Sequence, residues 1–214
     1  MTSATHAPSP DGTRRRARRG EGDRLREEIL NATADLLVEL GSADKVSTRG
    51  VAKRVGCSSP SLYLHFPDRA ALLYAVCERQ FEKLGEVLSL ALDGVDDPIE
   101  RLCTAAHAYA HFAIDHPEQY RVMMMDEGYD KVHEDDFAQL ATSVGFGLIV
   151  RTVQDGIDAG LLAPADPTLV ALSLWASVHG VVSLIIVKPN LAMPPLDELV
   201  DHVCRQNLDG MRPR

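Results

Sequence analysis

A short segment near residue 60 concentrates side chains that can bind DNA. Val55 to Leu73 reads VGCSSPSLYLHFPDRAALL, in which Tyr63, Leu64 and His65 stand in a row after serines and a proline. Tyrosine, histidine and serine can hydrogen-bond to phosphate oxygens or base edges, while proline and leucine can contact thymine methyl groups. Aromatic residues make up only 5 % of the chain, so a tyrosine among these polar groups indicates a specific role.

The spacing of apolar residues predicts the helices that would position this segment. Apolar residues recur every three or four positions over 23–40, which is typical of a helix with one buried face. A second helix is predicted over 48–55, ended by Gly56, and a third over 59–66, with Pro60 in its first turn. Two short helices around a tight turn form a helix-turn-helix, whose second helix lies in the DNA major groove.

The third predicted helix would turn its polar and aromatic residues outward. If Leu62 points into the core, a rotation of about 100° per residue places Phe66 on the same side. Pro60 and Leu64 then point away from the core, and Tyr63 flanks them. A folded protein gains no stability by exposing proline, leucine and tyrosine side chains to water. Each of them could instead contact phosphates, base edges or methyl groups of DNA.

The charge of the chain changes sign along its length. The net charge is −9, but residues 1–70 hold 12 Lys+Arg against 9 Asp+Glu, and residues 71–214 hold 10 against 22. Residues 1–20 include RRRARR and no apolar cluster, which predicts a disordered basic tail. Its arginines either remain in solvent without a specific role or form an arm that adds contacts to DNA.

The rest of the chain also has helical patterning, so we expect an all-α protein. No segment shows the alternation of a strand bounded by hairpin turns. The predicted helices span 69–92, 98–116, 117–125, 135–159, 167–187 and 196–208.

Composition also limits location and cofactors. The apolar run 172–187 is interrupted by serines, a histidine and a glycine, so no membrane span is expected, and the arginine-rich start is not a secretory signal. We therefore expect a cytoplasmic protein. The four cysteines have no zinc or redox spacing and are expected to be reduced. No cofactor is expected.

The segment LVELGSADKVSTRGVAKRVGCSSPSLYLHFPDRAALLYAV resembles the DNA-binding region of the TetR family of bacterial transcriptional regulators. The resemblance covers about Asp23 to Val76, a quarter of the chain, and its combined pattern is highly specific. Pro67 with Asp68 departs from the basic or small polar pair that is common in the family, which removes local positive charge. Beyond the basic tail that composition predicts over 1–20, the resemblance implies a helix-turn-helix domain over 21–67 and a helical effector-binding and dimerisation domain over 68–214.

The resemblance also implies which residues contact DNA. Taken singly, Tyr63 could pack between helices and His65 could be partly buried, but within this pattern both are expected to bind phosphates. The implied DNA-binding residues are Thr48, Arg49, Ser59, Pro60, Ser61, Tyr63, Leu64, His65 and Arg69.

The sequence of the C-terminal two thirds of the chain resembles known patterns less specifically. LWASVHGVVSLII is similar to a TetR subgroup marked by Trp-x-x-x-His-Gly, in which Trp175 and His179 share a helix face and Gly180 permits close approach of another helix. This cluster could pack the core or line a pocket. Met123, Met124 and Met125 offer adaptable apolar surface. The candidate effector-binding residues are His107, His111, Phe112, Met124, Phe146, Trp175 and His179.

His107 and His111 are four residues apart on one predicted helix. This spacing can chelate a metal ion, but the sequence fixes no third ligand, so pocket or core histidines are the preferred interpretation. Asp115, His116 and His179 are the available partners.

The resemblance implies a homodimer, formed by the last two helices, that binds a palindromic DNA operator and releases it when a small apolar effector binds. One alternative is an all-α small-molecule binder or enzyme on the same scaffold. Another is an activator, since the choice between activator and repressor depends on where the operator lies. No phosphate loop, nucleophile elbow or spaced carboxylate pair supports catalysis, and Gly145–Gly147 lacks the third glycine of a dinucleotide loop.

Overall fold

The computed structural model describes residues 21–125 and 144–213, and every regular element in these ranges is a helix. The all-α expectation is confirmed. The expected tail over 1–20 and the first part of the expected helix over 135–159 lie outside the described residues. The side chains of Met123 and Met125 lie outside them too. The described residues divide into two compact units, which are considered separately.

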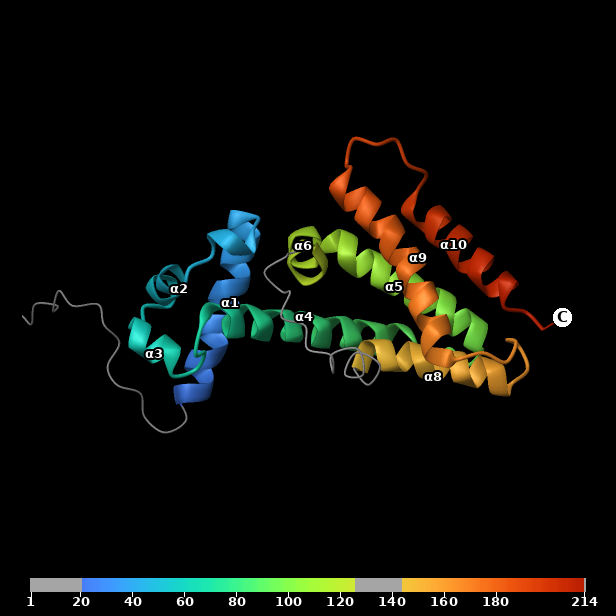
Figure 1. The fold of residues 1–214 in the computed structure, drawn as a ribbon, viewed down its shortest axis with the longest axis horizontal. Helices are drawn as coiled ribbons and strands as arrows, with labels where there is room; N and C mark the ends of the chain where they lie inside the picture. The colour runs from blue at the N-terminus through green and yellow to red at the C-terminus, as the bar shows by residue number, and fades with distance from the viewer. Residues whose placement is uncertain (1–20, 126–143, 214) are drawn as a thin grey trace, which may run out of the picture. The chain divides into compact units, whose positions relative to one another are not determined.

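The first unit begins with three α-helices (Figure 1). They are α1 (Glu21–Leu40), α2 (Thr48–Val55) and α3 (Ser59–Tyr63), with a short 3-10 helix, η1 (Ala43–Lys45), between α1 and α2. Ser47 caps α2 by accepting a hydrogen bond from the Gly50 amide, at 3.1 Å. Gly56 ends α2 at φ 73°, a left-handed conformation that glycine adopts without strain. These local signals explain why α2 has the bounds predicted from the sequence.

Helix α3 is shorter than the predicted 59–66. It ends at Tyr63. After it, the His65 amide donates a hydrogen bond to the Leu62 carbonyl three residues earlier, at 2.9 Å, which closes a turn tighter than that of an α-helix. Pro67 disfavours helical geometry in the residue before it, so the helix cannot continue through Phe66. The three-residue η1 was not predicted because so short an element has no periodicity.

The core of the first unit is formed by α1, α2, α3 and the start of α4. Ile29, Val51 and Leu62 are fully buried, and Phe66 is 3 % exposed. The Arg26 guanidinium lies 5.4 Å from the centre of the Phe66 ring, in a cation–π contact. The inward placement of Leu62 and Phe66 confirms the predicted rotation of α3.

Helix α4 (Arg69–Ala91) begins in the first unit and continues into the second. Asp68 caps it by accepting a hydrogen bond from the Ala71 amide at 2.7 Å. The division between the units falls after Cys77, so the first residues of α4 belong with the helix-turn-helix, whereas the expected domain boundary was at residue 67.

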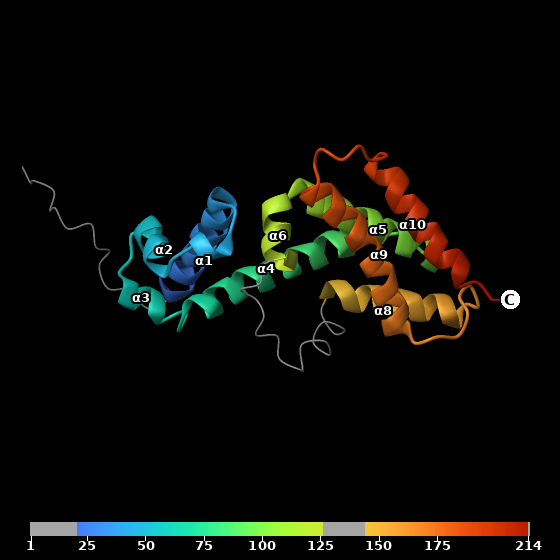
Figure 2. The same ribbon diagram turned by 45° about the horizontal axis from the view of Figure 1, so that its top comes forward.

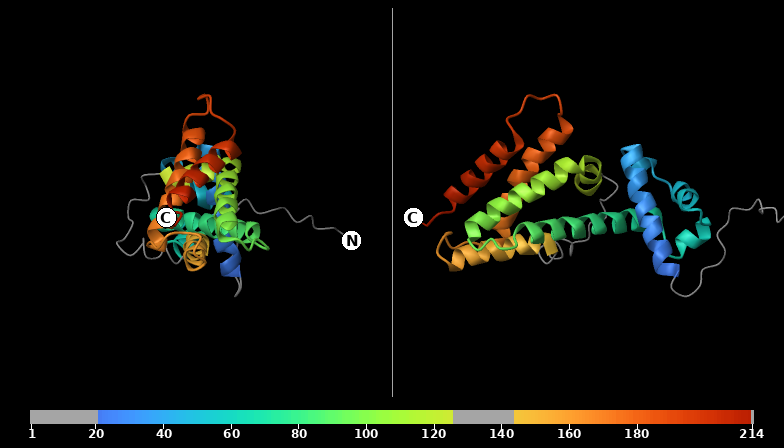
Figure 3. Two further views of the ribbon diagram at one scale, coloured as in Figure 1. Left: turned by 90° about the vertical axis from the view of Figure 1, so that its right-hand side faces the viewer. Right: turned by 180° about the vertical axis from the view of Figure 1, so that it is seen from behind.

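Within the described residues, the second unit holds the rest of α4 and five further helices (Figures 1 and 2). These are α5 (Pro98–Asp115), α6 (Pro117–Met125), α8 (Val144–Asp158), α9 (Pro167–Val187) and α10 (Leu196–Gly210). Helix α9 packs against α5, α8 and α10, and it runs antiparallel to α10 (Figure 3). Asp97 and Asp166 cap α5 and α9, each followed by a proline at the first helical position.

Helix α9 has the composition of a membrane span. An 18-residue window of this helix has a mean hydropathy of 2.1, so α9 is long and apolar enough to cross a membrane by length and composition alone. The core helix of a water-soluble protein can have the same composition, and Val170, Ala171 and Val182 of α9 are buried within the unit. A stripe of small and apolar residues on α9 stays exposed: Leu169, Ser173, Ala176, Gly180, Leu184 and Val187.

Candidate DNA-binding face and effector cavity

The outer side of α3 presents apolar and aromatic side chains to solvent. Leu64 is 86 % exposed and Tyr63 is 48 % exposed, although Leu62 beside them is fully buried. Pro60 is also exposed, and Ser59 is partly exposed. Together with the first residues of α2, these side chains form what we call the recognition face: Thr48, Arg49, Ser59, Pro60, Ser61, Tyr63 and Leu64.

A side-chain contact joins the two helices of the recognition face. The Tyr63 hydroxyl lies 3.2 Å from the Thr48 hydroxyl, at hydrogen-bond distance. Thr48 is the first residue of α2, where unpaired amides and the helix dipole favour a phosphate. Arg49 beside it is exposed. The structure therefore brings together Thr48 and Tyr63, which the sequence places 15 residues apart.

Three of the candidate DNA-binding residues, Ser61, His65 and Arg69, lie against other parts of the first unit. The Ser61 hydroxyl lies 2.8 Å from the Ser58 hydroxyl, which also caps α3. His65 is partly buried near Gly22 at the start of α1. Arg69 donates hydrogen bonds to the carbonyls of Val46 and Ala43, so its guanidinium fastens the segment around η1.

The second unit contains an apolar cavity of about 90 Å³. Among the described residues, all six helices of the unit contribute to its walls, for example Leu84 of α4, Ala106 of α5, Met124 of α6, Ile149 of α8, Leu174 of α9 and Cys204 of α10. No charged side chain is among the described residues that line it. Because few polar groups face the cavity, its chemistry suits a mainly apolar molecule.

The cavity includes three of the candidate effector-binding residues. Met124, Phe146 and Trp175 line it, and the Phe146 and Trp175 rings meet edge to face at 6.1 Å. The other four candidates, His107, His111, Phe112 and His179, are not among its lining residues. Phe112 is buried and stacks on the ring of His116 at 5.1 Å.

Both units match models of one protein family. Residues 29–76 match the model described as bacterial regulatory proteins, tetR family, and residues 102–206 match a tetracyclin repressor-like C-terminal domain. The HTH-type transcriptional activator FasR of Mycolicibacterium smegmatis is 31 % identical over 178 residues, covering 77 % of this chain and 76 % of FasR. The chain belongs to the TetR family.

Two further proteins are similar to most of this chain. The nucleoid occlusion factor SlmA of Vibrio campbellii is 27 % identical over 164 residues, covering 72 % of this chain and 80 % of SlmA. A solved structure of a protein of unknown function from Rhodococcus sp. RHA1 is 28 % identical with a TM-score of 0.74, covering 88 % of this chain and 96 % of the other. TetR-family membership identifies the chain as a DNA-binding transcription regulator with a helix-turn-helix head.

In this TetR-family chain, His179 stands at the centre of a polar network beside the cavity. Its Nδ1 lies 2.6 Å from the Tyr120 hydroxyl and 3.1 Å from that of Tyr109, which lines the cavity. The Tyr120 hydroxyl also lies 3.1 Å from that of Ser183. Burial lowers the pKa of His179 and so favours the neutral imidazole, whose Nδ1 can accept the shorter of the two tyrosine bonds.

The partners of His179 could not be found from the sequence. Tyr109 and Tyr120 lie 70 and 59 residues before it. The sequence shows only that His179 shares a face with Trp175, and the two rings are indeed 5.6 Å apart. Only the packing of α5 and α6 against α9 brings the tyrosines to it.

A cysteine pair joins α5 to α10. The Cys103 and Cys204 sulfur atoms are 3.1 Å apart, although 101 residues separate them in the chain. The hydrogen bond from the Cys204 thiol lowers the pKa of the Cys103 thiol to about 7, while the same contact and burial raise the pKa of Cys204. Cys103 is therefore the more reactive of the two.

Alkylation of Cys103 should have its pH midpoint near 7, because the thiolate is the reactive form. The Cys204→Ala variant removes the donor, so we expect the midpoint to move to about 8.5, the ordinary value for a thiol. Iodoacetamide labelling from pH 6 to 9, measured by mass spectrometry on the Cys103 peptide, gives both midpoints. Cys57→Ala, in the other unit, should leave the Cys103 midpoint unchanged. A wild-type midpoint near 8.5 would contradict the pairing.

Proposed function

We propose that this chain is a homodimeric, cytoplasmic repressor that binds a palindromic operator and releases it when a small apolar effector fills the cavity. The exposure of Tyr63 and Leu64 on the recognition face is the main observation that supports DNA binding. A monomeric fold gains little from an 86 % exposed leucine at this place, whereas thymine methyl groups and phosphates can use both side chains.

The exposed stripe on α9 supports a dimer. Leu169 is 62 % exposed, Leu184 50 % and Val187 49 %. Gly180 lies on the same stripe, and a methyl group added there would meet nothing within 4 Å, so this glycine is not needed for packing inside the described part of the chain. A second copy of α9 could approach closely at Gly180, as the Trp-x-x-x-His-Gly pattern implies. Two-fold pairing would match a palindromic site.

The cavity and the path of α4 support control by an effector. Leu84 and Leu88 of α4 line the cavity, while Leu72 and Val76, earlier on the same helix, are buried in the first unit. An effector that binds one position of α4 better than another would shift the spacing of the two recognition faces in the dimer. We include Trp175, Phe146 and Met124 in the effector site and place His179 behind it through Tyr109.

The charges of the described head suggest a role for the basic tail. Residues 21–70 hold seven Lys+Arg against eight Asp+Glu, so the basic excess of the first 70 residues comes entirely from residues 1–20. A regulator that neutralises phosphates loses DNA affinity steeply as salt rises. We propose that the arginines at 14–19 supply part of this salt dependence.

A substitution that fills the cavity should weaken the response to the effector and leave operator binding intact. A screen of small aromatic and aliphatic compounds by thermal shift provides a ligand, which we expect to weaken operator binding when it is added to the complex. The Ala106→Phe variant places a ring in the cavity, so a ligand can bind only by overpacking it at a cost of about 1–3 kcal/mol, which is roughly a 5- to 150-fold loss of ligand affinity. Its operator affinity without ligand should stay close to that of the wild type.

The matched control is Ala165→Phe, the same change in an exposed loop outside the cavity. This variant should respond to the ligand like the wild type. A ligand whose binding Ala106→Phe abolishes, but which never changes the operator affinity of the wild type, would rule out the proposed release.

A further inference from the structure

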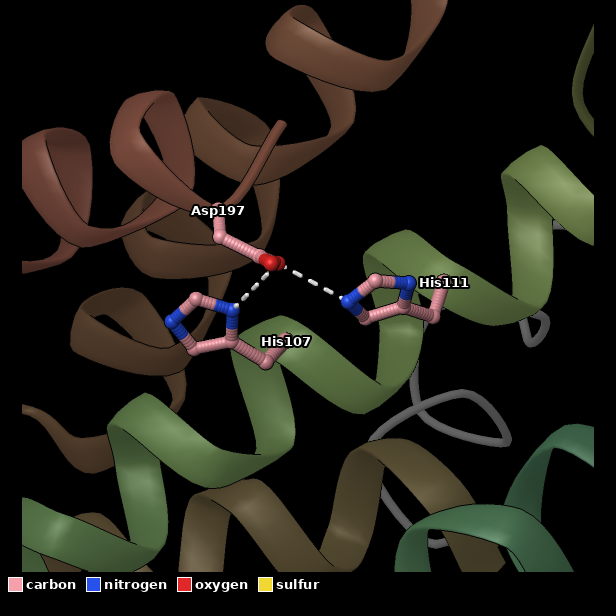
Figure 4. A group of neighbouring side chains, drawn as sticks. All are labelled: His107, His111 and Asp197. Atoms are coloured by element: carbon pink, nitrogen blue, oxygen red, sulfur yellow. Dashed lines mark hydrogen bonds and ion pairs between the residues drawn. The ribbon is translucent and has the colours of Figure 1, made fainter. Parts of the chain in front are cut away.

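The side of α5 that faces α10 carries a compact group of imidazole and carboxylate side chains. His111 Nε2 lies 2.8 Å from Asp197 Oδ1, and His107 Nδ1 lies 3.3 Å from the same oxygen. Figure 4 shows both rings turning a nitrogen toward the Asp197 carboxylate from neighbouring turns of α5. One ligand atom from each of the three residues lies within 4.8 Å of the others.

This geometry is close to that of a metal site. Two imidazole nitrogens and a carboxylate oxygen are ligands that Zn²⁺ and related divalent transition metals bind. Tetrahedral ligands at about 2.0–2.1 Å from an ion lie about 3.4 Å from each other. The His107–Asp197 distance of 3.3 Å already has this value, and the His111–Asp197 distance of 2.8 Å must open by about half an ångström. The His111 side chain is 53 % exposed and that of Asp197 is 65 % exposed, so both can adjust.

A second carboxylate holds the ring of His107 in the orientation that such a site needs. Asp201 Oδ1 lies 2.9 Å from His107 Nε2, the nitrogen that faces away from Asp197. Its other oxygen, Oδ2, lies 3.2 Å from the Arg205 guanidinium. When Nε2 donates its proton to Asp201, Nδ1 of a neutral ring keeps its lone pair for a metal ion. Histidines that bind metals usually have such a carboxylate partner on their other nitrogen.

We propose that His107 Nδ1, His111 Nε2 and Asp197 Oδ1 form a binding site for a divalent transition-metal ion of the Zn²⁺ class, with Asp201 as a positioning residue. The three ligands leave a coordination position for water. The ion ties α5, which lines the apolar cavity through Ala106, to α10. The site lies outside the cavity and does not depend on the proposed repressor function.

Zn²⁺ titration of the tag-free, chelator-treated full chain, in competition with a chromophoric chelator and without DNA, tests the proposal. We expect one tight site per chain, weakened at least about 100-fold by His111→Gln or Asp197→Asn. Asp201→Asn should weaken binding by about 10–100-fold while keeping the stoichiometry, because it only orients a ligand. His202→Gln, an exposed histidine on α10 outside the group, is the matched control and should bind like the wild type.

Two further measurements separate a structural effect from loss of the site. Zn²⁺ should raise the melting temperature of the wild type and of His202→Gln, but not that of His111→Gln, because only ligand binding to the folded state stabilises it. The visible spectrum of the Co²⁺ form should change in Asp201→Asn if His107 is a ligand. The proposal is overturned if Zn²⁺, Ni²⁺ and Co²⁺ all fail to bind the wild type tightly, or if His111→Gln keeps the wild-type affinity.

Discussion

A Tyr63→Ala, Leu64→Ala double variant is expected to lose specific DNA binding and to keep the stability of the wild-type chain. Both side chains are largely outside the fold, at 48 % and 86 % exposure. The contact between Tyr63 and Thr48 is itself exposed, so its loss should have little effect on unfolding. We therefore expect the double variant to lower the affinity for DNA and to leave the free energy of unfolding nearly unchanged.

The expected effect is large because the proposed dimer would contain the recognition face twice. A hydrogen bond from a tyrosine hydroxyl to a phosphate is worth about 1.5 kcal/mol, so losing it in both subunits costs about 3 kcal/mol. That is roughly a 150-fold loss of affinity before the apolar contacts of Leu64 are counted. Anisotropy with an operator selected from random DNA measures the loss, and thermal melting checks the fold.

The control for the double variant is Leu90→Ala, which removes a leucine that is 77 % exposed on α4. We expect it to bind the operator like the wild type. If the double variant binds within about threefold of the wild type, the recognition face is misassigned.

The second large effect is expected two residues away on the chain, at Leu62. This side chain is fully buried in the first unit, and Leu→Ala changes in protein cores cost about 2–5 kcal/mol. Leu62→Ala should therefore destabilise the head severely. Leu64→Ala is the same chemical change at a side chain that points to solvent, so it should have almost no effect on stability.

Amide hydrogen exchange can measure this difference in the head itself. Because the chain has two units, a single unfolding curve need not be two-state. Trp175 is the only tryptophan and lies in the second unit, so its fluorescence does not report on the head. We expect slow amides of α1 and α2 to exchange at least about 30-fold faster in Leu62→Ala. Unchanged exchange there would contradict the assignment of Leu62 to the core.

Much of the helical framework could be predicted because its signals are local. Pro167 marks the start of α9 in the sequence, as Gly56 marks the end of α2, and both bounds agree with the structure. The rotation of α3 also followed from a single inward residue, Leu62. By contrast, η1 and the early end of α3 depend on single-turn geometry that leaves no periodic pattern.

Side-chain partners were much harder to predict because they depend on which helices meet. The interval between His107 and His111 indicated a shared face, but nothing in the sequence showed that Asp197 lies opposite them. The partners of Arg69 within the head were missed for a similar reason. The resemblance implied a phosphate contact for Arg69, which stays a prediction, and the sequence did not show that its guanidinium also bonds the carbonyls of Val46 and Ala43.

The central claim is that the recognition face binds specific DNA. The most direct test is fluorescence anisotropy of the full chain with duplex DNA from immediately upstream of its own gene, at two salt concentrations. We predict tight binding that weakens by about tenfold or more from low to moderate salt and that Tyr63→Ala greatly reduces. Salt-independent or absent binding, both to this duplex and in a selection from random DNA, would contradict the account and favour a small-molecule binder on the same scaffold.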